Sequence, residues 1–431
     1  MLERIRQTPT RLRQIYSEFP GTFWTLMGAS FIDRLGGALL FPFFALYITF
    51  RFDVTMTEVG VLFAIFSVTG IVGSFMGGAL TDRFGRRAMI LFGLIVSATS
   101  TLIMGLITDL RVFYIAAALV GLLSDAGGPA QQAMVADLLP KEKLAEGYGI
   151  WRVLANLAVT FGPLIGGFIA SRSYLALFII DAITSLITAA IVIAVIPETR
   201  PPTAEGQEEE SFIQTVRGYS QVLRDRVYMA FIIISILVFT VYIPMNTTMP
   251  VYLRDVQSIP PSGYGYILSL NAAMVVLFQF WITRRLAGRA PMRMMALGAL
   301  LYAVGFGLFG VNAGLLFYAF AMAIITIGEM VIVPVSQALA ARFAPAHMRG
   351  RYLAMFGFSY AIPFAVGPLL AGLVMDNFDP RWVWWGGGIL GSIGVFAYLA
   401  LHLRVGRKLG LMDEGGETSA LPDIATATTE P

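Results

Sequence analysis

A series of long apolar segments constrains this chain more than any other feature of its sequence. A helix needs about 20 mostly apolar residues to cross the hydrocarbon core of a bilayer. Segments of that length lie at residues 21–48, 57–80, 87–108, 111–137, 144–170, 173–196, 227–250, 263–286, 292–312, 314–339, 349–375 and 382–403. These twelve segments predict an all-α integral membrane protein with both ends of the chain on the same side.

The composition is that of a membrane protein and argues against several other classes. The chain is 57% hydrophobic and 13% charged, whereas ordinary globular domains are about 25% charged. It has no cysteine, which excludes disulfides and thiol chemistry. The sequence also lacks a Walker loop and a His/Cys cluster with metal-ligand spacing. We therefore expect no enzyme activity and no bound metal or cofactor.

The basic residues are distributed unevenly between the two sides of this predicted layout. Of the 30 Lys and Arg residues, 23 fall on the side that holds both termini and five on the other side. Short loops rich in Lys and Arg remain in the cytoplasm. We therefore expect both termini in the cytoplasm and a multi-pass protein of the bacterial inner membrane. The pI of about 9.1 then reflects these loops, and no nucleic-acid partner is expected.

The chain also contains an internal repeat. A shift of 205 residues places the run G-P-L-I-G-G at residues 162–167 on G-P-L-L-A-G at residues 367–372, and it places Pro129 on Pro334. The fourth and fifth apolar segments therefore correspond to the tenth and eleventh. This correspondence predicts two homologous halves of six helices each, an arrangement that places transporter substrate sites between the halves.

The repeat and the polar segments together predict the domain organisation. The polar stretch between the halves leads into apolar positions at helical spacing, which is typical of a linker with a short interfacial helix. The acidic tail is typical of a disordered segment. The predicted parts are an N-terminal segment (1–20), the first half (21–196), a cytoplasmic linker (197–226), the second half (227–403) and the tail (404–431).

One loop carries a motif with a clear family resemblance. Residues 78–87 read G-A-L-T-D-R-F-G-R-R between two apolar segments. This pattern resembles the loop between helices 2 and 3 of the major facilitator superfamily, whose members are secondary transporters with twelve helices in two pseudo-symmetric halves. The resemblance implies that a set of loop residues controls the conformational change: Gly78, Asp82, Arg83, Gly85, Arg86 and Arg87. Asp82 is expected to face the positive N-terminus of helix 11, near Gly350.

A second motif lies in the fifth apolar segment. Pro163 removes one backbone hydrogen bond and bends the helix, while glycines four residues apart let another helix approach closely. The run resembles the antiporter signature of drug:proton exporters, which implies a role for Gly162, Pro163, Gly166 and Gly167. The sequence departs from those exporters at Ala117, where they often carry an arginine. Arg152 is the candidate to replace it.

Several charged or polar residues lie inside predicted membrane helices. A charge at a helix centre costs about 2.5–3.5 kcal/mol on insertion scales, so such residues need a partner or a function. The candidates for proton coupling or substrate binding are Asp33, Arg34, Asp125, Arg152, Asn156 and Glu329. The repeat aligns Ser124 with Glu329, so each half has an acid within one residue of the same symmetric position.

Each of these acids also has a structural interpretation. Glu329 could form a hydrogen bond that holds a neighbouring helix, and Arg152 could neutralise Asp125. Asp33 could pair with Arg34 or Arg152. Asp181, in the sixth segment, is interpreted as a structural or outer-vestibule residue.

The surroundings of Glu329 add a further resemblance. The run G-E-M-V-I-V-P at residues 328–334 resembles helix 10 of some bacterial proton-coupled multidrug transporters, where the acid helps to bind cationic drugs. At Asn246 some relatives carry an acid, and the amide here cannot titrate. That second proton site is therefore not expected in this chain.

These observations predict a proton-coupled secondary transporter that exports drug-like or amphipathic cationic compounds by alternating access. Its expected partners are a small-molecule substrate, protons and membrane lipid, the energy source is the proton gradient, and the expected state is a monomer. Two alternatives remain. One is an exporter or importer of a specific metabolite such as a sugar, and the other is a non-transporting membrane sensor or scaffold on the same fold.

Overall fold

The computed structural model describes residues 16–124, 127–140, 143–199, 219–286, 288–345 and 348–405. Within these residues there are twelve helical spans that are long and apolar enough to cross a membrane, and no strand. The predicted fold class and the order of the helices are therefore confirmed.

The first half of the chain contains six spans. They are formed by α2 (Gly21–Leu40), η1 (Phe41–Phe43) and α3 (Phe44–Phe52), then α4 (Met56–Phe84), α5 (Arg86–Leu106), α6 (Leu110–Ser124) with α7 (Gly127–Leu138), α8 (Leu144–Ala170) and α9 (Tyr174–Val195). Pro42 lies in the short 3-10 turn that interrupts the first span, because proline cannot supply the backbone N–H of a continuous helix.

The second half repeats this plan. Its spans are formed by α11 (Arg226–Tyr242), α12 (Pro244–Thr247) and α13 (Met249–Asp255), then α14 (Pro261–Leu286), α15 (Pro291–Phe309), α16 (Leu315–Phe343), α17 (Arg349–Asn377) and α18 (Trp382–Val405). The first span of each half is interrupted near a proline, Pro42 or Pro244. Both of these spans extend beyond their predicted ends, to Phe52 and Asp255, because the chain resumes a helix after the interruption.

Part of the predicted linker lies outside the described residues. At its start, Glu198 and Thr199 hydrogen-bond to residues of the first half. At its end, residues 219–224 are helical, and Val222 is fully buried in the core that includes Tyr228 of α11. Residues 200–218 are not described, nor are most of the predicted tail and the first 15 residues.

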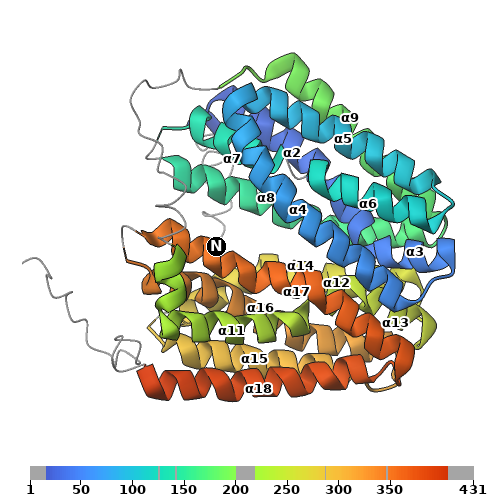
Figure 1. Ribbon diagram of the computed structural model, residues 1–431, viewed down its shortest axis with the longest axis vertical. Helices are drawn as coiled ribbons and strands as arrows, with labels where there is room; N and C mark the ends of the chain where they lie inside the picture. Colours follow the sequence, from blue (N-terminus) through green and yellow to red (C-terminus); the bar gives the residue numbers. More distant parts are fainter. Residues whose placement is uncertain are drawn as a thin grey trace, which may run out of the picture.

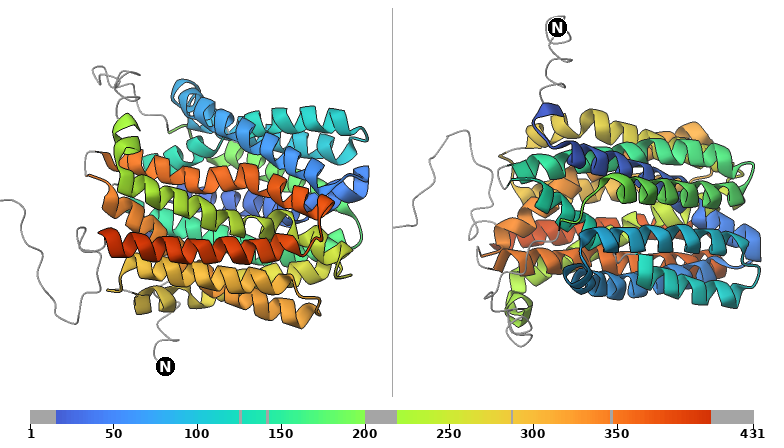
Figure 2. Two further views of the ribbon diagram at one scale, coloured as in Figure 1. Left: turned by 60° about the horizontal axis from the view of Figure 1, so that its bottom comes forward. Right: turned by 90° about the horizontal axis from the view of Figure 1, so that it is seen from above.

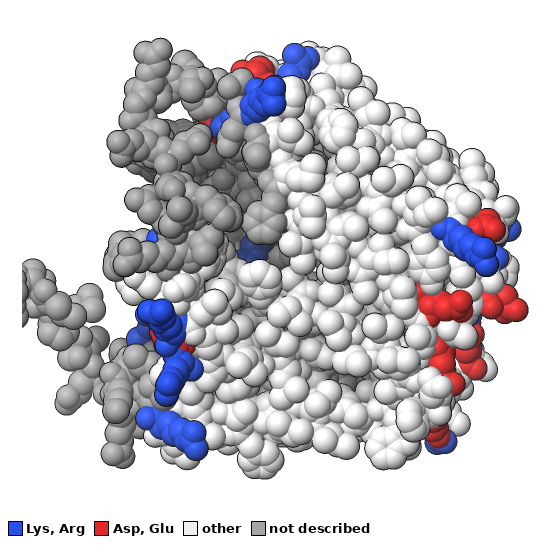
Figure 3. All heavy atoms as spheres, viewed as in Figure 1, with Lys and Arg blue, Asp and Glu red and all other residues white. Residues whose placement is uncertain are grey.

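The two halves lie side by side with their helices roughly parallel (Figures 1 and 2). We call the side on which α18 ends the termini face (left in Figure 1), and the other side the opposite face. The outward surface between these faces carries many exposed apolar side chains, such as Val68, Leu316 and Phe396. In Figure 3 the charged side chains lie at the two faces, and the region between them is almost free of charge, as a membrane-spanning belt requires.

The buried apolar residues form two clusters. One large cluster joins both halves and includes Phe43 and Phe63 of the first half together with Tyr252 and Tyr264 of the second. A second cluster, with Phe23 and Met134, consists of residues of the first half only. The shared cluster includes the first-half residues nearest the opposite face.

Two pairs of helices make the main contact between the halves, α4 with α17 and α8 with α14. Asp376 near the end of α17 accepts hydrogen bonds from the backbone N–H groups of Met56 (3.0 Å) and Thr57 (2.6 Å) at the start of α4. Arg254 of α13 donates to the Thr49 hydroxyl of α3 at 3.0 Å. All of these contacts lie at the opposite face.

Candidate functional site

Glu329 lies in the middle of α16 and is held by two neighbouring helices. The amide nitrogen Nδ2 of Asn271 in α14 donates to its Oε2 at 2.8 Å and also reaches the Thr326 hydroxyl at 3.0 Å. The Tyr242 hydroxyl of α11 forms a further hydrogen bond with the carboxyl group of Glu329. Asn271 is 7% exposed, so its amide is oriented by protein groups and hardly by solvent.

Two further tyrosines lie within electrostatic reach of this carboxyl group. Tyr302 of α15 and Tyr360 of α17 are close enough for their hydroxyls to interact electrostatically with Glu329. The rings of Tyr242 and Tyr302 are stacked with centroids 5.6 Å apart. The charge of Arg152, in α8 of the first half, also acts on the Tyr360 hydroxyl. The Tyr360 hydroxyl is therefore within electrostatic reach of an acid of one half and a cation of the other.

The acids of the first half have different partners. Asp33 in α2 accepts a hydrogen bond from the Ser185 hydroxyl of α9 at 2.8 Å, and Asp181 in α9 accepts one from the Thr101 hydroxyl of α5 at 3.0 Å. The two carboxyl groups are close enough to interact electrostatically. These hydrogen bonds lie inside the first half and connect α2, α5 and α9.

The structure describes three of the other candidate residues, Arg34, Arg152 and Asn156. The Arg34 guanidinium lies over the Trp151 ring, 4.7 Å from its centroid. Arg152 and Asn156 are exposed and lie one helical turn apart in α8. Asp125 lies outside the described residues, so its predicted pairing with Arg152 stays a prediction.

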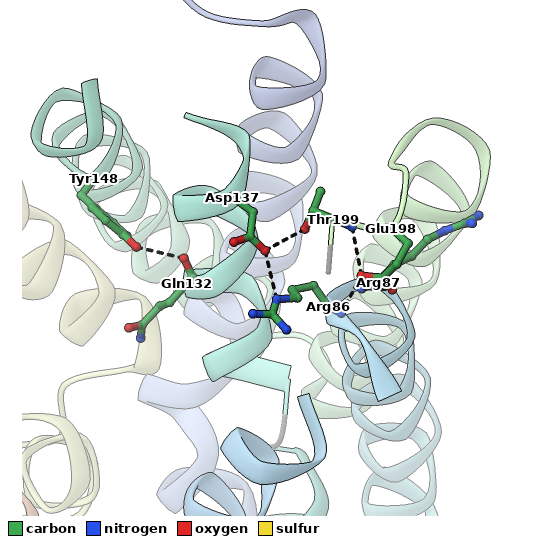
Figure 4. Close-up of polar contacts among 7 residues, drawn as sticks. All are labelled: Arg86, Arg87, Gln132, Asp137, Tyr148, Glu198 and Thr199. Atoms are coloured by element: carbon green, nitrogen blue, oxygen red, sulfur yellow. Dashed lines mark hydrogen bonds and ion pairs between the residues drawn. The ribbon is translucent and has the colours of Figure 1, made fainter. Parts of the chain in front are cut away.

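The loop motif connects the ends of three helices at the termini face (Figure 4). Gly85 has a φ of +94° and is the N-cap of α5. The backbone N–H groups of Arg86 and Arg87 donate to the two carboxylate oxygens of Glu198 at 2.8 and 3.1 Å. A Cβ at Gly85 would lie 2.4 Å from Glu198 Oε2, so both the conformation and the space require glycine.

The side chains of the motif extend these connections. Arg86 Nε forms an ion pair with Asp137 of α7 at 3.0 Å, and the Thr199 hydroxyl donates to the same carboxylate oxygen at 3.1 Å. The Arg87 guanidinium donates to the carbonyl oxygen of Ile193 in α9 at 2.7 Å. The loop therefore holds α5, α7 and α9 together. The side chain of Asp82 and the surroundings of Gly78 and Gly350 lie outside the described part of the structure.

The glycines of α8 are sites of close helix packing. A Cβ at Gly162 would lie 2.5 Å from that of Ala38, and one at Gly166 would lie 2.4 Å from the Leu39 carbonyl oxygen, both in α2. Gly167 faces the other half, where a Cβ would lie 3.0 Å from the Pro261 carbonyl oxygen of α14. This run therefore packs α8 against α2 on one side and against the second half on the other.

Sequence reasoning missed Asn271, Asp137 and Glu198. Asn271 is one amide within an apolar segment, which was a signal for a polar partner in the membrane. Glu198 was assigned to the linker, because no local pattern shows that an acid 112 residues away along the chain accepts from the Arg86 backbone. In the described part of the chain, no group of three or more His, Asp or Glu residues could hold a metal ion.

The chain matches one protein family and resembles transporters of other bacteria. The profile of the Major Facilitator Superfamily matches residues 26–364 and 258–422. A Na(+), Li(+), K(+)/H(+) antiporter of Planococcus maritimus is 26% identical over 84% of this chain and 91% of its own length. The multidrug resistance protein MdtH of Shigella flexneri is 23% identical over 77% of this chain and 81% of its own length.

Solved structures show the same architecture. The nucleoside transporter NupG, as its D323A mutant, superimposes with a TM-score of 0.78 at 13% identity, and the match covers 88% of this chain and all of NupG. A POT family transporter gives a TM-score of 0.73 at 14% identity over 90% of this chain and 96% of its own. The chain belongs to the Major Facilitator Superfamily. It is a multi-pass membrane transporter of that superfamily, whose members work without a bound cofactor.

Proposed function

We propose that this transporter is a proton-coupled antiporter that exports amphipathic cationic compounds, and that Glu329 exchanges a proton for the substrate. The observation that carries the proposal is the position of this carboxyl group. It lies in the middle of a membrane helix, bonded to the Asn271 amide and the Tyr242 hydroxyl. An ionisable group at that depth needs a partner or a function.

The hydrogen-bond partners suit both states of the carboxyl group. The Asn271 amide and the Tyr242 hydroxyl can both donate to a carboxylate. When the carboxyl group is protonated, its O–H can donate to the tyrosine oxygen, which also accepts. A cation that approaches the tyrosine ring favours the carboxylate and the release of the proton, and competition between the two is sufficient for antiport.

The aromatic surroundings favour an organic cation. The rings of Tyr242 and Tyr360 are only partly buried, and aromatic rings can attract a cation electrostatically and contact an apolar body. The charge of Arg152 opposes a cation that approaches from the first half. We infer that Arg152 helps to expel the substrate once the carboxyl group of Glu329 is protonated again.

The relatives support antiport but differ in their cargo. One is named for exchange of monovalent metal cations with protons and another for multidrug resistance. Exchange of Na⁺, Li⁺ or K⁺ for protons is therefore the second candidate function, favoured by the similarity to the Planococcus protein. Both candidates use Glu329, and the cation that is transported distinguishes them.

We further propose that the termini face is cytoplasmic and that the described conformation opens to it. The distribution of Lys and Arg supports this orientation. The contacts between the halves that involve Asp376 and Arg254 lie at the opposite face, which would then be closed to the exterior. The proposed location is the bacterial cytoplasmic membrane.

Reconstitution in vesicles with an imposed pH gradient tests the proposal. We expect the wild-type protein to drive uptake of a lipophilic cation dye against its gradient, and Glu329→Gln to reduce this coupled uptake by about 100-fold, the loss typical of a missing proton-transfer group. Glu146→Gln, at an exposed position of α8, is the matched control and should transport normally. Coupled uptake by Glu329→Gln at the wild-type rate would show that this acid is structural.

A further inference from the structure

The first half contains a cavity separate from the surroundings of Glu329. It has a volume of about 800 Å³ and lies among α2, α4, α5, α6 and α9, towards the opposite face. Aromatic side chains form much of its wall: Phe41, Phe44, Phe63, Phe66, Phe178 and Phe364. This volume is within the range of about 300–1,000 Å³ that is usual for small-molecule sites.

One region of the cavity wall is thin and has a carboxyl group directly behind it. Thr101 and Gly37 line the cavity there. The Thr101 hydroxyl donates to Asp181 Oδ2 at 3.0 Å. A Cβ at Gly37 would lie 4.0 Å from Asp181 Oδ1, so the missing side chain leaves that carboxylate oxygen next to the cavity. Asp181 itself is only 7% exposed.

The second half of the chain contributes one residue, Phe364, to the wall of the cavity. Phe41, at the start of η1, is 40% exposed, and its ring stacks on Phe364 of α17 with centroids 6.1 Å apart. Phe63 packs edge-on against both rings. Since Phe364 belongs to the second half, a movement of the halves would change the shape of this part of the wall.

We propose that this cavity binds the apolar body of an amphipathic cation, with the cationic end directed at Asp181 past Gly37. This inference rests on the proposed export of such compounds and adds a binding site for them in the first half. Aromatic rings attract cations as well as apolar groups. The acid gives the cavity a charge that a neutral lipid chain would not match. No Lys or Arg is among the described residues that line it.

A direct binding measurement tests the site without any pH gradient. The full chain in lipid nanodiscs is titrated with 4-phenylbutyltrimethylammonium, an aromatic compound with its cation at one end, and with 4-phenylbutanol, a neutral compound with the same apolar body, at one pH. We expect Asp181→Asn to weaken binding of the cation by about tenfold, because the charge acts at short range in a medium of low polarity. Binding of the neutral compound should change little.

Two Gly→Ala variants of α2 provide a second test together with its control. Gly37→Ala adds a methyl group between the cavity and Asp181, with no described atom closer than 4.0 Å, so the variant should fold. Gly28→Ala changes the same helix at a position with no described atom within 4 Å. We expect Gly37→Ala to weaken binding of the cation several-fold more than binding of the neutral compound, and Gly28→Ala to bind both like the wild type.

Two results would overturn the inference. One is equal cation binding by wild type, Asp181→Asn and Gly37→Ala, which would indicate that a lipid chain fills the cavity or that the cation binds elsewhere. The other is an equal loss of both compounds in the two variants, which would indicate a structural role for Asp181. Either result would leave the proton coupling of Glu329 untouched, because coupling is measured as gradient-driven uptake. Loss of that coupling in Glu329→Gln would in turn say nothing about this cavity.

Discussion

The two ends of the interface between the halves differ in how closely the helices approach. At the opposite face, a Cβ at Gly372 of α17 would lie 2.3 Å from the Met56 carbonyl oxygen, and one at Gly265 of α14 would lie 2.5 Å from the Pro163 carbonyl oxygen. At the termini-face end of α17 and α8, Gly357 and Gly149 have no described atom within 4 Å of an added Cβ.

This difference shows how the repeat contributes to the interface. The shift of 205 residues places Gly167 on Gly372. Gly167 packs against α14, and Gly372 packs against α4. Each half therefore provides one glycine-containing helix to the closed end, so the two contacts are related by the symmetry of the repeat. Tight packing at the opposite face agrees with the proposed conformation, since alternating access requires a state that is closed at one end.

Labelling with an impermeant thiol reagent tests which end is open, and it should give the largest difference. The chain contains no cysteine. We expect Asn156→Cys, at an exposed position of α8, to react in everted vesicles and not in right-side-out vesicles. Ser359→Cys, at a fully buried position, is the control and should react in neither. Reaction of Asn156→Cys only in right-side-out vesicles would reverse the proposed orientation.

The difference in packing between Gly372 and Gly357 predicts that alanine at these two positions of α17 has very different effects on the stability of the protein. Gly372→Ala forces α17 away from the Met56 backbone, and overpacking of this kind costs about 1–3 kcal/mol. We expect this variant to lower the thermal unfolding midpoint in detergent and to slow transport. Gly357→Ala should leave both unchanged or raise the midpoint slightly, since alanine favours the helix. Equal midpoints for the two variants would mean that the closed end is not tightly packed.

The acids of the two halves can be compared through their hydrogen-bond donors. Asn271→Leu leaves Glu329 without its amide partner, and an unsatisfied buried acceptor costs about 1–3 kcal/mol. We expect a shift of the pH at which coupled transport is half-maximal, together with a transport loss of about tenfold. Ser185→Ala removes one hydroxyl from Asp33 and should change transport by less. A larger loss for Ser185→Ala would move the coupling site to the first half.

The smallest effect is expected at the termini face. Glu198→Gln removes the charge of a carboxylate that accepts hydrogen bonds from two backbone N–H groups at the start of α5. An exposed negative charge at a helix N-terminus contributes about 0.3–1 kcal/mol to the free energy of unfolding. We expect a small decrease in the unfolding midpoint and a near-normal transport rate. Glu146→Gln removes an exposed acid from the first turn of α8, where it pairs with Lys143 at 3.7 Å, and it should lower the midpoint by no more than Glu198→Gln does.

The sequence predicted the helices accurately because the membrane requires long apolar segments. The ends of most predicted spans lie within a few residues of those in the structure, for example 144–170 for α8. The largest difference is at the end of α13, at Asp255 instead of residue 250, because the span is interrupted at Pro244 and the chain then resumes a helix. The resemblance to the superfamily, drawn from residues 78–87, is confirmed by the match to its profile.

The candidate site was predictable only in part. The cost of a charge in a membrane helix identified Glu329 and Asp33 as residues that need a partner. The sequence did not show which residues are the partners, because Asn271 is 58 residues from Glu329 and Ser185 is 152 residues from Asp33 along the chain. The predicted contact of Asp82 with helix 11 stays a prediction, since that side chain is not described.

The sequence by itself determined the number of spans, their order, the charge asymmetry and the repeat. These properties depend on the composition of short stretches, and the bilayer acts on each stretch separately. Only the tertiary structure decided which contacts join the halves at the opposite face, which amide reaches Glu329 and where a cavity remains beside Asp181. Those features depend on how side chains from several helices share one space, and no single stretch of sequence contains that information.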